Sequence, residues 1–222
     1  MEQENTFAPE DFVGWFAHAV TDAAVHNLAH TPPDQARALI TQVAAYLVDH
    51  NRDLVVDEAA EVHLSMCAVV LAAYRVVRSE METQEAVAVM KGAMTGPFRG
   101  WLRDSVFQVF GQGPDPYNGI ANTSKAKEVH LYGESFRFDR PSDDDNCYHL
   151  VVRTCFYNEF CRRNGAAELT QAWCAFDTGW MDVVNETDRG VAVDRPMTMG
   201  LGGDHCDFII RRTRSNGPEV LQ

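Results

Sequence analysis

Residues 57–79, with the sequence DEAAEVHLSMCAVVLAAYRVVRS, decide the fold of this chain. Val62, Met66 and Val70 are among the apolar residues that recur at helical spacing and nearly surround the predicted helix. A helix that is apolar on almost every side is buried in the protein. We therefore expect this segment to be the central helix, with Cys67 as a residue of the hydrophobic core.

Helices are predicted on both sides of this central segment. Before it, residues 9–30 open with Pro9-Glu10-Asp11, a signature of a helix start, and residues 34–49 follow after a break at Thr31-Pro32-Pro33. After it, residues 83–109 carry a helical pattern that is interrupted at Gly96-Pro97. Because proline fits the first turn of a restarted helix, we expect a kink or a break there.

The character of the sequence changes after Phe110. Residues 111–127 are rich in turn formers and have no apolar period, which marks the main internal boundary. Strands are predicted at 129–138, 147–153, 191–199 and 206–212, the last two joined through 200–203 as a hairpin, and short helices at 156–163 and from 167 to about 176. The fold class is therefore α+β: a helical N-terminal half, residues 1–110, packed on a small antiparallel sheet with inserted short helices, residues 128–213, in one compact domain.

Composition and charge exclude several classes of function. The chain has 222 residues and a formal net charge of -13, with 11 acidic and two basic residues in positions 1–64. Such a protein repels phosphate backbones, so we expect no nucleic-acid partner. The start has no basic and apolar leader, and no run of about 18 apolar residues is evident. We expect a cytoplasmic protein without a membrane partner, one that binds a small-molecule substrate and for which a homodimer is left open.

Six cysteines are the main candidates for chemistry, because the chain has no P-loop, no nucleophile elbow and no His-Glu-x-x-His motif. A cytosolic setting keeps thiols reduced, which leaves metal binding, catalysis or burial. Cys155 follows a strand and opens a helix, where the positive end of the helix dipole lowers the pKa of a thiol. This position suits a nucleophile. The alternative is that Cys155 packs beneath the sheet, as free cysteines commonly do.

Two further pairs of residues define the geometry expected in the C-terminal third. Cys174 and Asp177 lie three residues apart on one predicted helical face and can address one site, although a solvated Asp177 beside a buried Cys174 is equally compatible with the pattern. In the last strand, Cys206 points to one face of the sheet, whereas His205 and Asp207 point to the other. Cys206 is therefore expected to be a support or a ligand rather than the active centre.

With these residues in place, the C-terminal third resembles the family of L-2-amino-thiazoline-4-carboxylic acid hydrolases. The resemblance covers about residues 60–212, and its motifs appear in the family's order. They are Ala72-Ala73-Tyr74, Glu85-Ala86, Cys155-Phe156-Tyr157, Gly165, Glu168-Leu169, Cys174, Asp177, Thr198-Met199-Gly200 and Gly203-Asp204-His205-Cys206-Asp207-Phe208.

The resemblance implies hydrolytic opening of a thiazoline or another small heterocycle. In this hypothesis the Cys155 thiolate attacks the C2 carbon, and Asp177 orients or deprotonates water, with Cys174 nearby. The candidates for substrate binding are Tyr157, Arg153, His205 and Cys206, and the cation for a substrate carboxylate is one of Arg153, Arg195 and Arg211.

A second resemblance gives a rival function. The closing motif is also similar to that of vinyl-reductase-type sensor domains, which are small-molecule binders, some of them with zinc. The upstream zinc positions of those domains are Arg195 and Thr198 here, and neither is a good zinc ligand. We therefore expect no cofactor, with a zinc held by Cys155, Cys174 and Cys206 as the remaining alternative.

Overall fold

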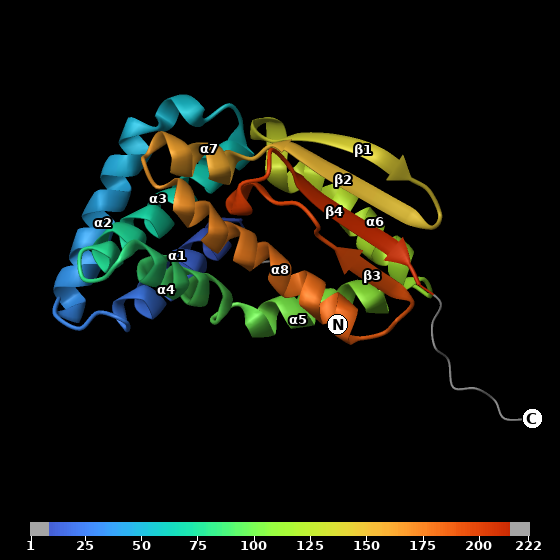
Figure 1. Cartoon of the computed structure of the whole chain (residues 1–222), viewed down its shortest axis with the longest axis horizontal. Helices are drawn as coiled ribbons and strands as arrows, with labels where there is room; N and C mark the ends of the chain where they lie inside the picture. Colours follow the sequence, from blue (N-terminus) through green and yellow to red (C-terminus); the bar gives the residue numbers. More distant parts are fainter. Residues whose placement is uncertain (1–8, 214–222) are drawn as a thin grey trace, which may run out of the picture.

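The computed structural model describes residues 9–213. Its helical half contains α1 (Pro9–Val25), α2 (Pro33–His50), α3 (Glu58–Arg78), α4 (Thr83–Thr95) and α5 (Arg99–Gly111). These helices confirm the predicted pattern, including the break between α4 and α5 at Gly96-Pro97. Figure 1 shows α1–α4 gathered on one side of the molecule and the sheet on the other, with α5 and α8 (Thr170–Glu186) between the two. The α+β fold class is confirmed.

The central helix α3 is as buried as its sequence predicts. Thirteen of its residues are buried, Cys67 among them. By length and composition α3 could cross a membrane, but 72% of its most apolar window is covered by the rest of the protein, as expected of a core helix. Its first turn is fixed by Asp57, whose side chain accepts from Ala60 N at 2.7 Å and from Glu134 N at 2.6 Å.

The region predicted as a boundary, residues 111–127, contains an additional helix. Helix α6 (Pro116–Lys127) begins at Asp115, whose carboxylate accepts from the amide of Asn118, and Pro116 occupies its first turn. The sequence pattern did not predict this helix, because the helix buries only Tyr117, Ile120 and Ala121. Three buried residues are too few to make a visible apolar period, whereas its cap and N-terminal proline were readable signals.

The first predicted strand also begins later than expected. Residues 129–138 were predicted as a strand, but Glu128–Tyr132 form a π-helical turn (η2), Gly133–Ser135 a 3-10 turn (η3), and strand β1 runs from Arg137 to Asp143. Gly133 adopts φ 63°, which favours glycine, and the Asp57 side chain lies against it. The apparent alternation of residues 129–138 therefore belongs to aromatic residues that pack around a turn, with Tyr132 against Phe136 and Phe138.

The sheet has four antiparallel strands in the order β1-β2-β4-β3, with β2 at Cys147–Thr154, β3 at Val191–Asp194 and β4 at Cys206–Arg212. Val152 pairs with Cys206, and Tyr148 with Ile210. Strand β3 ends five residues before its predicted end, and residues 195–205 form a long connection with a 3-10 turn, η5 (Met199–Leu201), in place of a tight hairpin. Helix α7 (Phe156–Arg163) agrees with its prediction, whereas α8 continues ten residues beyond Phe176.

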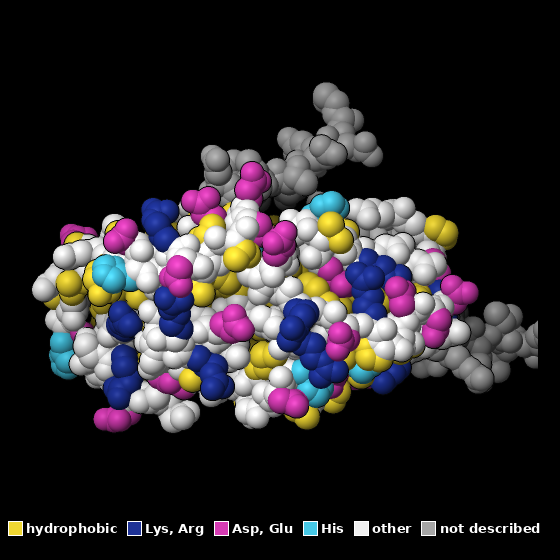
Figure 2. All heavy atoms as spheres, turned by 90° about the horizontal axis from the view of Figure 1, so that it is seen from above, with side chains coloured by type: hydrophobic (Ala, Val, Ile, Leu, Met, Phe, Trp, Pro, Cys, Tyr) yellow, Lys and Arg dark blue, Asp and Glu magenta, His cyan; other side chains and the backbone are white. Residues whose placement is uncertain are grey.

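Two apolar clusters form the core. The larger surrounds α3, and the smaller lies between the sheet and α5, α6 and α8. Phe138 and Phe208 pack against both clusters. Acidic and basic side chains are interspersed over the face of the molecule shown in Figure 2.

Candidate active site

A cavity of about 300 Å³ lies between the inner face of the sheet and the helices α5, α6 and α8, where the two apolar clusters meet. Apolar and aromatic side chains make up most of its wall. One end contains the three cysteines that the sequence singled out, Cys155, Cys174 and Cys206, and we call it the cysteine end. Asp177 and Arg195 line the same cavity, so the structure brings these candidates together.

Cys174 and Cys206 share a hydroxyl group at the cysteine end. Thr198 Oγ1 lies 3.0 Å from Cys174 Sγ and 3.6 Å from Cys206 Sγ. The amide of Met199 donates to Cys206 Sγ at 3.3 Å. Arg195 Nη2 already donates to Thr198 Oγ1 at 3.1 Å, so the hydroxyl proton of Thr198 is free to point at a sulfur.

These contacts separate the acidities of the two thiols. A hydrogen bond from Cys174 lowers the pKa of Cys206, with further lowering from the Met199 amide, Thr198 and Arg195, and together they outweigh the opposing effect of burial. The same hydrogen bond and burial raise the pKa of Cys174. The hydrogen bond between the two thiols therefore favours the thiolate form at Cys206 over the thiolate form at Cys174.

Arg195 supplies the positive charge of this end. Its Nη1 donates to Cys174 O at 2.8 Å, and its guanidinium lies 4.8 Å from the ring centroid of Phe208. Its Nε is buried and has no hydrogen-bond partner in the described residues 9–213. Of the three arginines that the sequence offered, Arg195 is the one that lines the cavity.

Asp177 lies one helical turn after Cys174, as the spacing predicted, and both side chains line the cavity. Burial raises the pKa of Asp177, and Arg195 and Lys127 oppose this effect only in part. Lys127, at the end of α6, retains exposed surface, yet the protein around its ammonium lowers the pKa of the side chain. The carboxyl group of Asp177 therefore stays protonated to a higher pH than that of an ordinary aspartate.

Cys155 lies where the sequence placed it, directly before α7, but the pKa of its thiol is raised and not lowered as the sequence predicted. Burial raises the pKa of Cys155 to about 12, although the amides of Asn158 and Tyr157 at the helix start act in the opposite direction. The desolvation of a thiolate outweighs the short helix terminus because α7 has only eight residues and the sulfur lies in an apolar wall. Cys155 is therefore a protonated thiol at neutral pH.

Aromatic side chains complete the wall between Cys155 and α8. The ring of Tyr157 stacks on Trp173 with 4.1 Å between centroids, and its hydroxyl lies 3.1 Å from His63 Nδ1. Burial lowers the pKa of His63 to about 4, so this histidine is neutral at physiological pH. The sequence did not single out three residues of the cavity wall. Lys127 lies in the turn-rich segment 111–127, Tyr132 in the segment predicted as a strand, and Trp173 in a predicted short helix without a distinctive motif.

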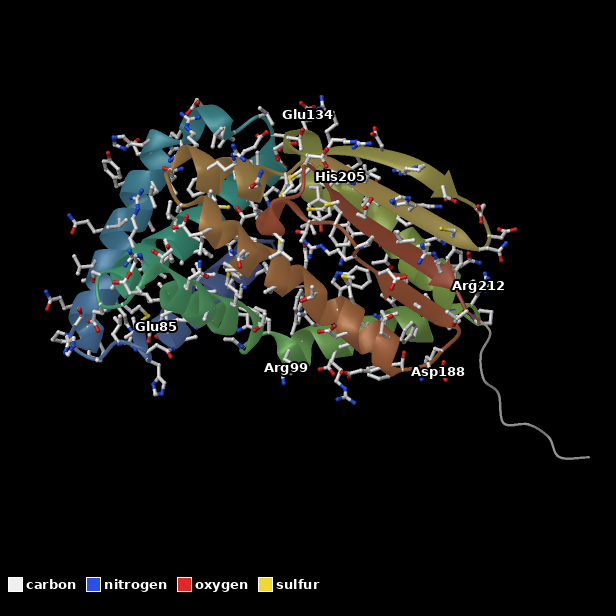
Figure 3. All side chains as sticks on the ribbon, viewed as in Figure 1. Glu85, Arg99, Glu134, Asp188, His205 and Arg212 are labelled. Carbon is white, nitrogen blue, oxygen red and sulfur yellow. The ribbon has the colours of Figure 1, made fainter. Side chains whose placement is uncertain are left out.

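Two of the candidates for substrate binding lie outside the cavity. Arg153 points away from it and pairs with Asp139 at 2.7 Å. His205, at the start of β4 (Figure 3), contacts Asp204 and Asp207 on the outer face of the sheet, where Asp207 also contacts His149 at 2.8 Å. The alternation predicted for β4 is thus observed, with Cys206 inward and its neighbours outward. Arg211 likewise pairs with Asp194 on the outside.

The cysteine end has no metal geometry. Among the residues that the structure describes, no group of three or more His, Cys, Asp or Glu side chains is placed to hold a metal ion. Arg195 and Thr198, at the positions where the sensor domains carry zinc ligands, instead bond to each other and to the cysteines.

Several residues of the remaining sequence motifs have structural contacts around the cavity. Tyr74 of α3 donates to Glu168 at 2.6 Å, which joins α3 to the 3-10 turn η4 (Ala167–Leu169). Gly200 lies so close to Cys174 that a Cβ atom there would approach the sulfur to 2.7 Å. These motif residues position the elements that carry the cavity.

The sequence and the structure were compared with known proteins. A family model described as L-2-amino-thiazoline-4-carboxylic acid hydrolase matches residues 63–210. No curated protein matches the sequence. The crystal structure of the Fe(II) unliganded H-NOX protein from K. algicida is 8% identical, with a TM-score of 0.42 over 92% of this chain and 98% of that one. The NMR structure of the SO2144 H-NOX domain from Shewanella oneidensis in the Fe(II)CO ligation state is 13% identical, with a TM-score of 0.34 over 79% and 98%.

Proposed function

Because the chain belongs to the L-2-amino-thiazoline-4-carboxylic acid hydrolase family, we propose that it hydrolyses a small heterocyclic acid, a thiazoline or related cyclic amidine, at a ring C–S or C–N bond. One observation carries the proposal. The donors around Cys206 hold the pKa of its thiol below the ordinary value, while burial holds the pKa of Asp177, in the same cavity, above it. One environment thus keeps a thiolate together with a carboxylic acid, a nucleophile with a proton donor.

The reaction follows from these two groups. The Cys206 thiolate attacks the electrophilic C2 carbon, a new C–S bond forms, the ring bond breaks, and the departing atom takes the proton of Asp177. The Asp177 carboxylate then removes a proton from water, whose oxygen attacks the same carbon. The bond from that carbon to Cys206 breaks and the thiolate is restored. One water is consumed, and nothing is oxidised or reduced.

The nucleophile in this scheme is Cys206 and not Cys155. A thiol whose pKa is about 12 is almost entirely protonated at neutral pH, and the thiolate is the reactive form. Cys155 then contributes to the wall, and Cys174 and Thr198 stabilise the thiolate by donating to it.

Lys127 is the cation that this scheme assigns to the substrate carboxylate. Arg195 already donates to Cys174 O and Thr198 Oγ1, whereas Lys127 makes no ion pair or hydrogen bond within residues 9–213. An ammonium without a partner in a cavity wall is favourable for an anionic ligand. Tyr157, which also lines the cavity, offers its ring to the heterocycle.

The test replaces the nucleophile. Cys206→Ala is expected to lose roughly 10³-fold or more in kcat/KM on a thiazoline or cyclic amidine that the wild type hydrolyses. Cys147→Ala, on the outer face of the sheet, is expected to behave as wild type. In Asp177→Asn the second step lacks its base, so the adduct on Cys206 should accumulate and add the substrate-derived mass in intact-protein mass spectrometry. Full activity of Cys206→Ala would exclude this mechanism, as would an adduct mapped to Cys155.

A binding module without catalysis is the second candidate, and the predominantly apolar cavity wall favours it. Turnover separates the two. A panel of thiazolines, cyclic amidines and lactams is incubated with the protein and analysed by mass spectrometry for ring-opened products. If members of the panel bind but none is consumed, the protein is a binder of the sensor-domain kind.

A further inference from the structure

The cavity continues well beyond the cysteine end. Its other part, which we call the apolar arm, is lined by Val106 and Val109 of α5, Ile120 of α6, Leu150 of β2 and Trp180 of α8. The proposed reaction uses none of these five side chains. Their chemistry is aliphatic and aromatic throughout.

Lining residues on β2, α8 and α6 follow the cavity along one direction, and their spacing gives its length. On β2, lining residues run from Val152, the partner of Cys206, to Tyr148, which at about 3.3 Å per residue is about 13 Å. On α8 they run from Thr170 to Trp180, and the part from Cys174 to Trp180 is about 9 Å at 1.5 Å per residue. On α6 they run from Lys127 back to Ile120, about 10 Å. Figure 3 shows the same direction along β4, from His205 beside Cys206 to Arg212 at the far end.

A small heterocyclic acid would fill only part of this length. With bonds of about 1.5 Å, a five-membered ring with one carboxylate spans roughly 5–6 Å. Such a molecule, held between Lys127 and Cys206, leaves the apolar arm empty. The five side chains of the arm offer water only the indole N–H of Trp180, and apolar side chains predominate in the cavity wall although Ser105, Gln108, Gln112, Thr123, Ser124 and Tyr148 also line it. An apolar group of the ligand is therefore favoured against these five residues.

We infer that the natural ligand carries a bulky apolar substituent, a branched alkyl or aryl group, that occupies the apolar arm while its heterocyclic acid head lies at the cysteine end. The inference rests on the proposed function only for the identity of the head. The length and the chemistry of the arm define the substituent.

The experiment compares ligands that share one head. Isothermal titration calorimetry is run with 2-methyl-, 2-pentyl- and 2-phenyl-2-thiazoline-4-carboxylic acid on the full-length protein. Burying each added CH₂ is expected to tighten binding by about threefold to fourfold. The pentyl compound has four more carbons than the methyl compound, so it should bind about 80-fold to 250-fold tighter if all four are buried, and about tenfold tighter if only two are. Trp101, Trp173 and Trp180 line the cavity, and quenching of tryptophan fluorescence gives an independent measure of occupancy.

Two variants test the place of binding. Val109→Phe fills the arm and is expected to remove the advantage of the pentyl and phenyl compounds while the methyl compound binds as before. Val129→Phe, at a residue that is 66% exposed and outside the cavity lining, is the matched control. Should Val109→Phe unfold, Trp180→Ala provides the second variant, since it removes an aromatic wall of the arm and should weaken only the longer ligands.

The outcomes are separable from those for the hydrolase proposal. Affinity that does not rise with the substituent, or a Val109→Phe variant that weakens methyl and pentyl compounds equally, would overturn the inference, because the arm would then be only an entry path. If affinity rises with the substituent but no compound is consumed, the inference stands and the hydrolase proposal fails. If the compounds are hydrolysed but their affinities do not change with the substituent, the hydrolase proposal stands and the inference about the apolar arm fails.

Discussion

At the residue scale, the acidity of each cysteine follows from its donors and its burial. Cys206 accepts from the Cys174 thiol and from a backbone amide and lies near a hydroxyl and a guanidinium, and the pKa of its thiol is lowered although the side chain is buried. Cys155 has the start of a short helix, and burial raises the pKa of its thiol to about 12. Several converging donors stabilise a thiolate, whereas one short helix terminus does not offset desolvation.

The pH dependence of turnover is expected to reflect Cys206 and Asp177. The proposed reaction needs a thiolate and a protonated carboxyl group, so kcat/KM should rise with pH through the lowered pKa of Cys206 and fall through the raised pKa of Asp177. Asp177→Asn should remove the fall at the alkaline side along with most of the activity. A profile whose only inflection lies near the ordinary thiol pKa of about 8.5 would contradict the assignment.

The same carboxyl group should influence stability. Its pKa in the folded protein is raised, so between the pKa of the unfolded chain and that of the folded protein, stability falls as pH rises. Above this window Asp177→Asn should therefore melt at a higher temperature than wild type, and below it the two should melt alike. Differential scanning fluorimetry across pH measures the difference, and an Asn variant that is less stable at alkaline pH would argue that Asp177 is held ionised by Arg195 and Lys127.

At the element scale, the 3-10 turn η5 sets the position of the cysteines. A Cβ at Gly200 would lie 2.7 Å from Cys174 Sγ and 3.3 Å from the backbone of Gln171, so Gly200→Ala must displace the sulfur. We expect a loss of roughly 10-fold or more in kcat/KM with little loss of helix content by circular dichroism. Gly100→Ala, in α5, where a Cβ meets nothing within 4 Å, is the control and should be neutral or slightly stabilising. Equal activity of both variants would contradict a positioning role for η5.

The contact between α3 and η4 is expected to contribute to stability. Tyr74→Phe removes the hydrogen bond to Glu168 and should reduce the free energy of unfolding by about 1 kcal/mol in urea titrations. Tyr46→Phe, at a ring that is 56% exposed, should change it by less than about 0.5 kcal/mol. If the two variants lose the same amount, the Tyr74 hydroxyl has no special role.

At the scale of the whole molecule, the two halves of the chain form their core together. Helix α8, from the C-terminal half, packs against α4 and α5, and α7 packs against the central helix α3. Phe16 of α1 stacks on Trp173 of α8 with 5.9 Å between ring centroids. The core of the helical half is therefore completed by residues far along the chain.

This arrangement predicts that the helical half does not fold alone. A fragment of residues 1–110 should show reduced helix content and no cooperative urea transition, because α3 and α4 would expose the apolar surface that α7 and α8 cover. The full chain should unfold in one transition by circular dichroism and by tryptophan fluorescence. A fragment that unfolds cooperatively with native helix content would instead make residues 1–110 an independent domain.

The sequence was most informative where the pattern was long and continuous. The apolar residues on nearly every side of segment 57–79 predicted the central helix α3, and Gly96-Pro97 predicted the break between α4 and α5. The strands predicted at 147–153 and 206–212 agree with β2 and β4. It was least informative at α6 and at residues 128–136, where few residues are buried and turn chemistry resembles alternation. The order of the motifs along the chain also identified the family, since this order can be read from the sequence without knowing which residues are in contact.

By itself, then, the sequence determined the α+β class, the family and the set of cysteines from which a nucleophile could come. Only the tertiary structure decided that Arg195 lies at Cys206 while Arg153 and His205 lie outside the cavity, that Lys127 joins it from α6, and that Cys206 is more acidic than Cys155. The physical reason is that the pKa of a buried thiol depends on which groups donate to it and on how much water is excluded. Those groups come from η5, α8 and the loop after β3, which only folding brings within hydrogen-bond distance.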